Sequence, residues 1–255
     1  MSVATHELPG TRRVEQIMGL PVVVDVRDDD DAGPALERMF DWLRWVDATF
    51  STYKDDSEIS RINRGELRRD DAHPEVSQVL ERCDRLREET EGYFDMRAPG
   101  GSLDPSGLVK GWAIDRAAAI LDEAGLHNYA LSGGGDMRVL GRAVPELTWR
   151  VGIQHPLERQ HVAAVVEATD LAIATSGAYA RGDHLWNPHS GLPPSGVLSV
   201  TIVGPELGTA DAYATAAFAM GPERGPQWTA RLAGYEAMTI LADETVFKTG
   251  GFPDD

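Results

Sequence analysis

Apolar residues recur at helical spacing in two segments of the first half of the chain. After the acidic turn at residues 28–31, they fall on one face of a helix at intervals of three and four. These positions are Leu36, Met39, Phe40, Leu43, Val46 and Phe50. A second amphipathic helix is expected over residues 74–91, with Gly92 as its stop signal. Both apolar stripes are typical of helices that pack on a core, so neither indicates a ligand.

Shorter apolar stretches predict strands and further helices. Residues 11–27 predict two short strands around Gly19, and residues 128–141 predict two strands joined by a glycine turn. Further strands are expected at 149–154, 161–175 and 197–204, a hairpin at 236–250, a short helix within 51–65, and helices at 108–123, 209–220 and 226–233. Strands and helices do not alternate as in a parallel sheet. The sequence therefore predicts an α+β fold with mixed sheets and packed helices.

Composition and charge restrict the possible partners. The chain has 24 Lys and Arg against 41 Asp and Glu, a net charge of −17, which opposes binding to nucleic acid or to an anionic membrane. No run of about 18 apolar residues occurs, so stable membrane insertion is not expected. The first residues show neither an apolar signal-peptide core nor a lipid-attachment cysteine, and a cytoplasmic location is expected. The lone Cys83 is expected to be a small buried side chain.

The domain organisation is expected to be simple. The sequence shows neither an internal repeat nor an interdomain linker. We therefore expect one domain over residues 1–255, with residues 1–13 as a flexible N-terminal segment.

The predicted helix at 209–220 carries a candidate metal site. Asp211 and Thr215 are four residues apart and therefore lie on one face. A carboxylate and a hydroxyl suit a hard cation that prefers oxygen ligands. Asp is also common in the first turn of a helix, where the helix dipole favours it, and for the pair alone this is the favoured interpretation.

Residues 104–111 predict a turn that leads into a helix. The backbone N–H groups at such a helix start can bind an anion, and Lys110 is placed to neutralise a phosphate. The spacing of a Walker A loop is absent. An ordinary capped helix start with an exposed lysine fits the same pattern equally well.

Two glycine-containing segments complete the candidate chemistry. Ser132–Asp136 has three glycines that permit close approach of a ligand, although the segment is also typical of a hairpin turn. Residues 174–191 are rich in Ser, Thr, His and Asp, and His184 is a candidate general acid or base. The spacing of the histidines and the distant cysteine disfavour a zinc site.

The order of these segments resembles the ApbE family of FAD:protein FMN transferases. The resemblance runs from about residue 14 to residue 248, and its most specific parts are STYKDDSEISRIN at 51–63 and the D-x-x-G-x-x-K-G-x-A-x-D pattern that starts at Asp104. Further matching stretches are Met18-Gly19, GYFD at 92–95, NYALSGGGDMRVLG at 128–141, IATSGAYARGDHLWNPHSG at 173–191 and TADAYATAAFAMG at 209–221. The resemblance implies a single ApbE-like, T-fold-like domain.

The resemblance also implies roles for matching residues. Asp211 and Thr215 would bind Mg²⁺, together with the backbone carbonyl of Gly107. FAD would be bound by Met18, Tyr53, Tyr93, Phe94, Asp95, Asp104, Lys110 and Trp186. His184 would transfer a proton, with Asp104 behind it.

The implied reaction moves FMN from FAD to a Thr or Ser hydroxyl of an acceptor flavoprotein and releases AMP. The residues leave two alternatives open. One is an FAD pyrophosphatase that gives FMN and AMP, with water in place of the acceptor. The other is a non-catalytic FAD-binding protein.

One segment departs from the family pattern. The usual Asp-Pro-x-Thr-Gly is Asn187-Pro188-His189-Ser190-Gly191 here. If residue 187 acts on His184, loss of the carboxylate should leave the histidine neutral more readily. If residue 187 shapes the turn before Pro188, Asn and Asp are equivalent there. The turn interpretation is the favoured one.

Overall fold

The computed structural model describes residues 10–28, 31–98, 100–177 and 186–254. Within this part of the chain, eight strands form one antiparallel sheet and three form a smaller antiparallel sheet. The large sheet contains, in spatial order, β1 (Thr11–Ile17), β2 (Leu20–Val26), β3 (Tyr129–Gly133), β4 (Asp136–Leu140), β8 (Asp170–Gly177), β9 (Val197–Gly204), β10 (Glu236–Leu241) and β11 (Val246–Lys248). The small sheet contains β5 (Arg142–Val144), β6 (Leu147–Gln154) and β7 (Val162–Ala168).

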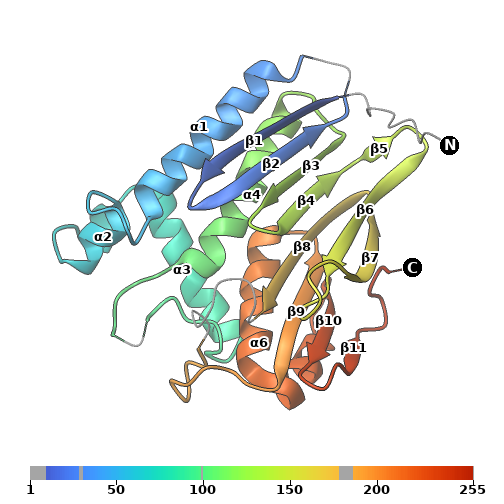
Figure 1. The fold of residues 1–255 in the computed structure, drawn as a ribbon. Helices are drawn as coiled ribbons and strands as arrows, with labels where there is room; N and C mark the ends of the chain where they lie inside the picture. Colours follow the sequence, from blue (N-terminus) through green and yellow to red (C-terminus); the bar gives the residue numbers. More distant parts are fainter. Residues whose placement is uncertain (1–9, 29–30, 99, 178–185, 255) are drawn as a thin grey trace.

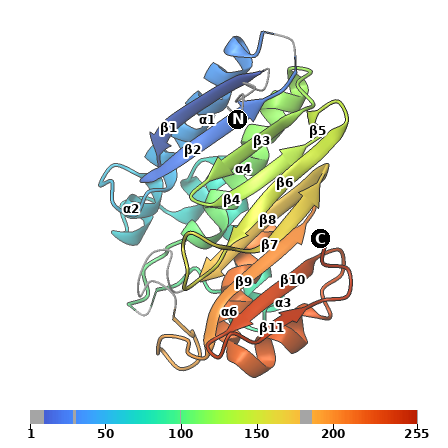
Figure 2. The same ribbon diagram turned by 45° about the vertical axis from the view of Figure 1, so that its right-hand side comes forward.

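Helices cover one face of the large sheet, and the small sheet covers the other (Figure 1). The helices are α1 (Gly33–Phe50), α2 (Glu58–Asn63), α3 (Pro74–Glu89), α4 (Ser106–Glu123) and α6 (Leu207–Thr229), with a 3-10 turn at Arg69–Asp71. Figure 2 shows β6 and β7 in front of the large sheet and the helices behind it. The result is a layered α+β fold, as the sequence predicts.

Each face of the large sheet has its own hydrophobic core. On the helical side, the apolar positions predicted for residues 36–50 are all buried, as are those of α3. On the other side, Trp149 and Val166 of the small sheet pack with Val139 and Met238 of the large one. Alternation along a strand places neighbouring residues in opposite cores, so both faces of the large sheet are apolar.

The predicted strand at 161–175 is wrong as a single element. It forms β7, which pairs with β6, and β8, which pairs with β4 and β9, so the chain changes sheets between Ala168 and Asp170. Both halves are apolar because each faces a core. Their pairing partners lie elsewhere in the sequence, and local periodicity does not reveal them.

The two helices predicted at 209–220 and 226–233 are parts of α6, which ends at Thr229. They meet at Gly221, whose φ of 83° and ψ of −172° are not helical. The second part begins at Pro222, directly after this break. Proline fits the first turn of a helix, where the backbone N–H groups have no acceptor within the helix. The predicted second helix therefore starts too late and ends too late.

The start of the described chain belongs to the sheet. Strand β1 begins at Thr11, so residues 11–13 of the expected flexible N-terminal segment pair with β2. Among the described residues, no helix is both long enough and apolar enough to cross a membrane.

Candidate functional site

The site is built where α4 crosses α6. Glycines on both helices allow the backbones to approach each other closely. A Cβ at Gly111 would lie 2.6 Å from the Leu207 carbonyl oxygen, and a Cβ at Gly208 would lie 3.1 Å from the backbone nitrogen of Trp112. Real Cβ atoms do not tolerate the first of these distances, so α4 and α6 could not lie this close with a side chain at position 111.

A charged cluster lies beside this crossing. The Lys110 ammonium of α4 pairs with Asp136 at the start of β4 and lies 3.4 Å from the Asp211 carboxylate of α6. The two carboxylates are almost completely buried, since Asp136 is 2% exposed and Asp211 is 3% exposed. Two buried carboxylates therefore meet at one lysine ammonium. Carboxylate oxygens are among the ligands that a hard cation prefers.

Hydroxyl groups at the end of β8 adjoin the cluster. The backbone N–H of Thr175 donates to Asp136 Oδ1 at 3.0 Å, and this bond aims the other carboxylate oxygen at Lys110. The Ser176 hydroxyl lies 3.3 Å from the Thr215 hydroxyl. The Asp211/Thr215 face of α6 is therefore lined by oxygen atoms from β4, β8 and α6.

The residues fit a hard cation. The contacts between α4 and α6 run antiparallel, from Asp115 near Leu207 to Lys110 near Asp211, and Gly107 lies about one turn before Lys110 on α4. The proposed ligands are a carboxylate, a hydroxyl and a carbonyl, which suit Mg²⁺. In the described part of the chain, no three His, Cys, Asp or Glu side chains gather in a group that could hold a metal.

Asp104 and Lys110 differ in what their side chains contact. Asp104 Oδ1 accepts from the backbone N–H of Ser106 at 3.1 Å and so closes the turn that starts α4. Lys110 is bound to the two buried carboxylates, as described above. The sequence predicts either a lysine that neutralises a phosphate or an exposed lysine, whereas this side chain is 19% exposed and its ammonium neutralises protein carboxylates.

The residues predicted to bind the flavin differ widely in how deeply they are buried. Tyr53 is 91% exposed, whereas Phe94 is buried beneath α4, where a Cβ at Gly107 would lie 3.1 Å from its ring. Met18 is half-buried in the β1–β2 turn with a φ of 56° and packs at the edge of the helical-side core. Of these three, Phe94 packs against the start of α4.

Tyr93 and Asp95 lie in the connection between α3 and α4. The Tyr93 ring lies 4.4 Å from the His189 ring and 5.1 Å from the Arg224 guanidinium carbon. Asp95 forms ion pairs with Arg87 and Arg97 at 2.8 and 3.2 Å. Tyr93 thus links the α3–α4 connection to the turn that contains His189 and to the second part of α6.

The turn at residues 186–192 is fixed by Asn187. Its Oδ1 accepts from the backbone N–H groups of His189 and Ser190, and its Nδ2 donates to the Ala219 carbonyl at 3.1 Å. Trp186 is half-buried just before it. His184, the predicted proton-transfer group, lies outside the described residues.

Two buried or half-buried carboxylates near the site were missed by the sequence analysis as functional residues. Asp136 ends the predicted hairpin turn, which is confirmed by the pairing of Gly133 with Asp136. Asp115 ends the D-x-x-G-x-x-K-G-x-A-x-D pattern, and that pattern was the available signal for it. The structure places both in contact with elements that carry the candidate metal ligands.

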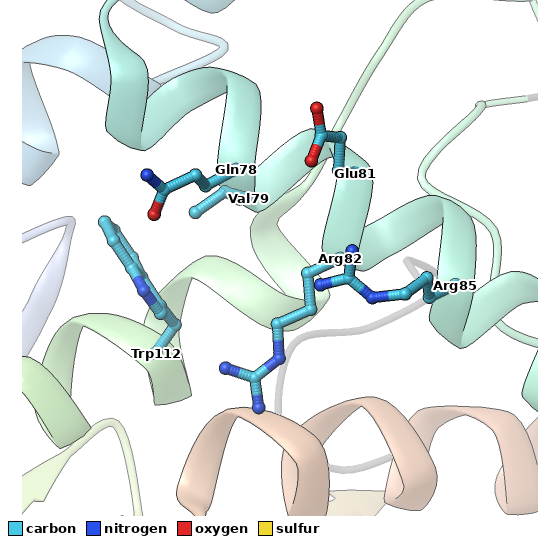
Figure 3. A pocket seen from close by; sticks show the side chains of 6 residues that line it. All are labelled: Gln78, Val79, Glu81, Arg82, Arg85 and Trp112. Carbon is cyan, nitrogen blue, oxygen red and sulfur yellow. The ribbon is translucent and has the colours of Figure 1, made fainter.

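A separate pocket of about 260 Å³ lies between α3 and α4 (Figure 3). It is lined by Gln78, Val79, Glu81, Arg82, Arg85 and Trp112. Residues two positions apart on a helix point about 200° apart, so Trp112 faces away from Lys110 and its cluster. This pocket is therefore not part of the site described above.

Comparisons with known proteins point to one family. The ApbE family matches residues 18–100 and 96–239. The FAD:protein FMN transferase of Vibrio cholerae serotype O1 is 36% identical over 133 residues, which are 48% of this chain and 40% of that protein. The FAD:protein FMN transferase of Treponema pallidum is 30% identical over 205 residues, which are 70% of this chain and 57% of that protein. The chain spans about half the length of these curated relatives.

Solved structures share the fold. The flavin transferase ApbE from Vibrio cholerae matches with a TM-score of 0.84 at 23% identity, over 96% of this chain and 98% of that one. The ApbE protein from Thermotoga maritima matches with a TM-score of 0.84 at 21% identity, again over 96% and 98%. The predicted α+β, ApbE-like fold is confirmed.

Proposed function

The chain belongs to the ApbE family, and we propose that it is a magnesium-dependent FAD:protein FMN transferase. The observation that carries this proposal is the oxygen-lined cluster of buried carboxylates at the crossing of α4 and α6. It has two buried carboxylates and one lysine, and its hydroxyls come from a neighbouring strand and helix. Similarity to FAD:protein FMN transferases supplies the substrate class.

The proposed reaction is a phosphoryl transfer. An oxygen of an acceptor Thr or Ser hydroxyl forms a bond to the phosphorus on the FMN side of FAD. The bond from that phosphorus to the bridging oxygen breaks, AMP leaves with the bonding electrons, and FMN stays on the acceptor as a phosphoester. The proton of the hydroxyl passes to a base, for which His184 is the candidate, with Asp104 behind it. Reactions of this type depend mainly on positioning and on stabilisation of charge.

The residues of the cluster have distinct parts in this proposal. Asp211, Thr215 and the Gly107 carbonyl would hold Mg²⁺, which supplies charge neutralisation for the pyrophosphate when bound. Lys110 keeps Asp136 and Asp211 in place and limits the repulsion between these carboxylates and the phosphate groups. At the N-terminus of α4, the backbone N–H of Ser106 donates to Asp104, and those of Leu108 and Val109 donate to the Pro105 carbonyl, which fixes the start of this helix.

The test combines mass spectrometry with one pair of variants on the same helix. Wild-type protein, FAD, Mg²⁺ and candidate acceptor flavoproteins are incubated, and the acceptor mass is measured. We expect a gain of one FMN with wild type and with Glu223→Ala, an exposed position on the second part of α6. We expect no gain with Asp211→Ala or with EDTA.

Other results would contradict parts of the proposal. FMN and AMP formed at equal rates with and without acceptor would identify a pyrophosphatase. FAD that stays bound and unchanged with every acceptor offered would indicate a binding protein. Full activity of Asp211→Ala in chelator would remove the metal assignment.

A further inference from the structure

Asp115 of α4 caps the start of α6. Its Oδ1 accepts from the backbone N–H of Leu207 at 3.0 Å, and its Oδ2 accepts from that of Gly208 at 2.9 Å. These are the first two residues of α6, and the residue before them, Glu206, makes no capping bond with its own side chain. The first N–H groups of a helix need partners from outside the helix. Here a neighbouring helix provides them.

The bond to α6 makes Asp115 more than an ordinary cap. Two parallel N–H to carboxylate bonds fix direction as well as distance, because both oxygens are engaged at once. One turn earlier on α4, Gly111 lies directly against the Leu207 carbonyl and leaves no room for α6 to move toward α4. The carboxylate therefore prevents α6 from moving away, and the backbone contact prevents it from moving closer.

The start of α6 is also held from α3. Arg82 Nη2 donates to the Glu206 carboxylate at 2.6 Å and to the Thr209 hydroxyl at 2.7 Å, and Figure 3 shows this side chain reaching toward α6. These contacts involve the side chains of Glu206, just before α6, and of Thr209 in α6, whereas Asp115 binds the α6 backbone. Asp115 is thus the side chain that sets the position of the α6 backbone relative to α4.

The position of α6 relative to α4 decides the geometry of the candidate cation site. Asp211 lies one turn beyond Leu207 on α6, and its partner Lys110 lies on α4. The ligands proposed above come from both helices, with Asp211 and Thr215 on α6 and the Gly107 carbonyl on α4. A change in the spacing or axial position of the two helices changes every distance across the site.

We propose that Asp115 is a positioning residue for the divalent-cation site, acting through the α6 backbone rather than by contact with the cation. This inference rests on the proposed function, since it takes Asp211, Thr215 and Gly107 as the ligands. Partners that orient metal ligands commonly change metal affinity by about 10- to 100-fold when they are removed. We therefore expect Asp115→Asn to weaken cation binding although it touches no ligand atom.

The test is a Mn²⁺ titration followed by electron paramagnetic resonance of the free ion, without FAD. Asp115→Asn keeps one acceptor oxygen and turns an amide N–H toward a backbone N–H. The matched control is Asp122→Asn, which removes a carboxylate from the same helix at a position bonded to the Tyr129 hydroxyl. Binding is compared per folded molecule, at a temperature below the unfolding transition of each protein. We expect about tenfold weaker binding for Asp115→Asn and wild-type binding for Asp122→Asn.

The outcomes separate this inference from the proposed function. Wild type that binds no Mn²⁺ would contradict the metal site itself. Wild type and Asp115→Asn that bind equally well would overturn the positioning role while leaving the metal site intact.

If Asp115→Asn does not fold, Gly208→Ala tests the same idea. Its Cβ would press on the Trp112 backbone and shift α6 by a few tenths of an ångström. Gly250→Ala is its control, because a Cβ there meets open space. Weaker Mn²⁺ binding by Gly208→Ala alone supports the proposal, and equal binding by the two variants overturns it.

Discussion

Both the oxygen and the nitrogen of the Asn187 side-chain amide form hydrogen bonds. The oxygen accepts from two backbone N–H groups of its own turn, and the nitrogen donates to the Ala219 carbonyl. That carbonyl lies just before the break in α6 at Gly221, where the regular helical pattern of hydrogen bonds is interrupted. Asn187 therefore shapes the turn, as the favoured interpretation expects, and also ties the turn to the helix that carries Asp211.

We predict that Asn187→Asp loses stability at neutral pH. An aspartate keeps the oxygen acceptor but places a carboxylate oxygen against the Ala219 carbonyl, at a cost of about 1–3 kcal/mol. A protonated carboxyl could donate to that carbonyl, so the unfavourable contact is confined to the ionised form. Its penalty is present above the folded-state pKa and diminishes as the pH falls through that value.

Urea unfolding of both proteins at pH 4.5 and pH 7 measures this effect. The prediction is supported if the variant has a lower free energy of unfolding than wild type and if this loss is larger at pH 7 than at pH 4.5. A variant equal to wild type at both values would contradict the role given to the amide nitrogen. Whether the substitution also shifts the pH–rate profile through His184 stays a prediction.

Cys83 gives a second prediction at the scale of one residue. The side chain is fully buried in α3, and burial raises the pKa of its thiol to about 12. The thiolate is the reactive form, so it is scarce at pH 8. We expect the native protein to resist iodoacetamide at pH 8 and the urea-unfolded protein to gain one carbamidomethyl group. Rapid alkylation of the native protein would contradict this burial.

At the scale of elements, α6 depends on its break. Gly221 has a φ of 83° with ψ near 180°, a conformation that is essentially restricted to glycine. A Cβ there would meet only the Ser195 carbonyl, at 4.0 Å, so space is not the constraint. The break lets the first part of α6 end beside Ala219 and the second part begin with Pro222.

We predict that Gly221→Ala lowers the free energy of unfolding by about 1–3 kcal/mol, because alanine cannot adopt this backbone conformation without strain. Chemical denaturation measures the loss. Gly250→Ala is the control, since that glycine has open space and no positive φ. If the two variants are equally stable, the backbone conformation at Gly221 is not the source of the constraint.

At the scale of the whole molecule, the two faces of the large sheet have separate tasks. The candidate site lies on the helical face, whereas the small sheet builds a second core on the other. Trp149 belongs to that second core and also donates its ring N–H to the Leu140 carbonyl at 2.9 Å. A substitution in the second core therefore tests the stability of the protein without directly altering the site.

We predict that Trp149→Ala costs about 3–5 kcal/mol of stability, the usual range for removing a buried aromatic side chain. Mn²⁺ affinity per folded molecule should stay at the wild-type value, because Trp149 packs in the core on the face of the large sheet opposite α4 and α6. Denaturant titration gives the first quantity and the spectroscopic titration the second. A parallel loss of cation affinity would show that the two faces are coupled.

The sequence alone determined the elements whose evidence is local. Helices α1 and α3 follow from apolar residues three and four apart, and the β3–β4 hairpin follows from its glycines. Spacing also places Asp211 and Thr215 on one face of a single helix, and the family resemblance makes them candidate ligands. Such features depend on the period of a single element, which a sequence carries directly.

Only the tertiary structure decided which groups meet across elements. It divided residues 161–175 between two sheets, joined Lys110 to Asp136 and Asp211, and turned Asp115 toward the backbone of α6. These contacts join residues far apart in the chain, and no local pattern sets their distance. The carboxylate of Asp115 caps α6 because Gly111 and Gly208 allow the backbones of α4 and α6 to come close. This close approach depends on how the helices pack, and the periodicity of the sequence does not reveal it.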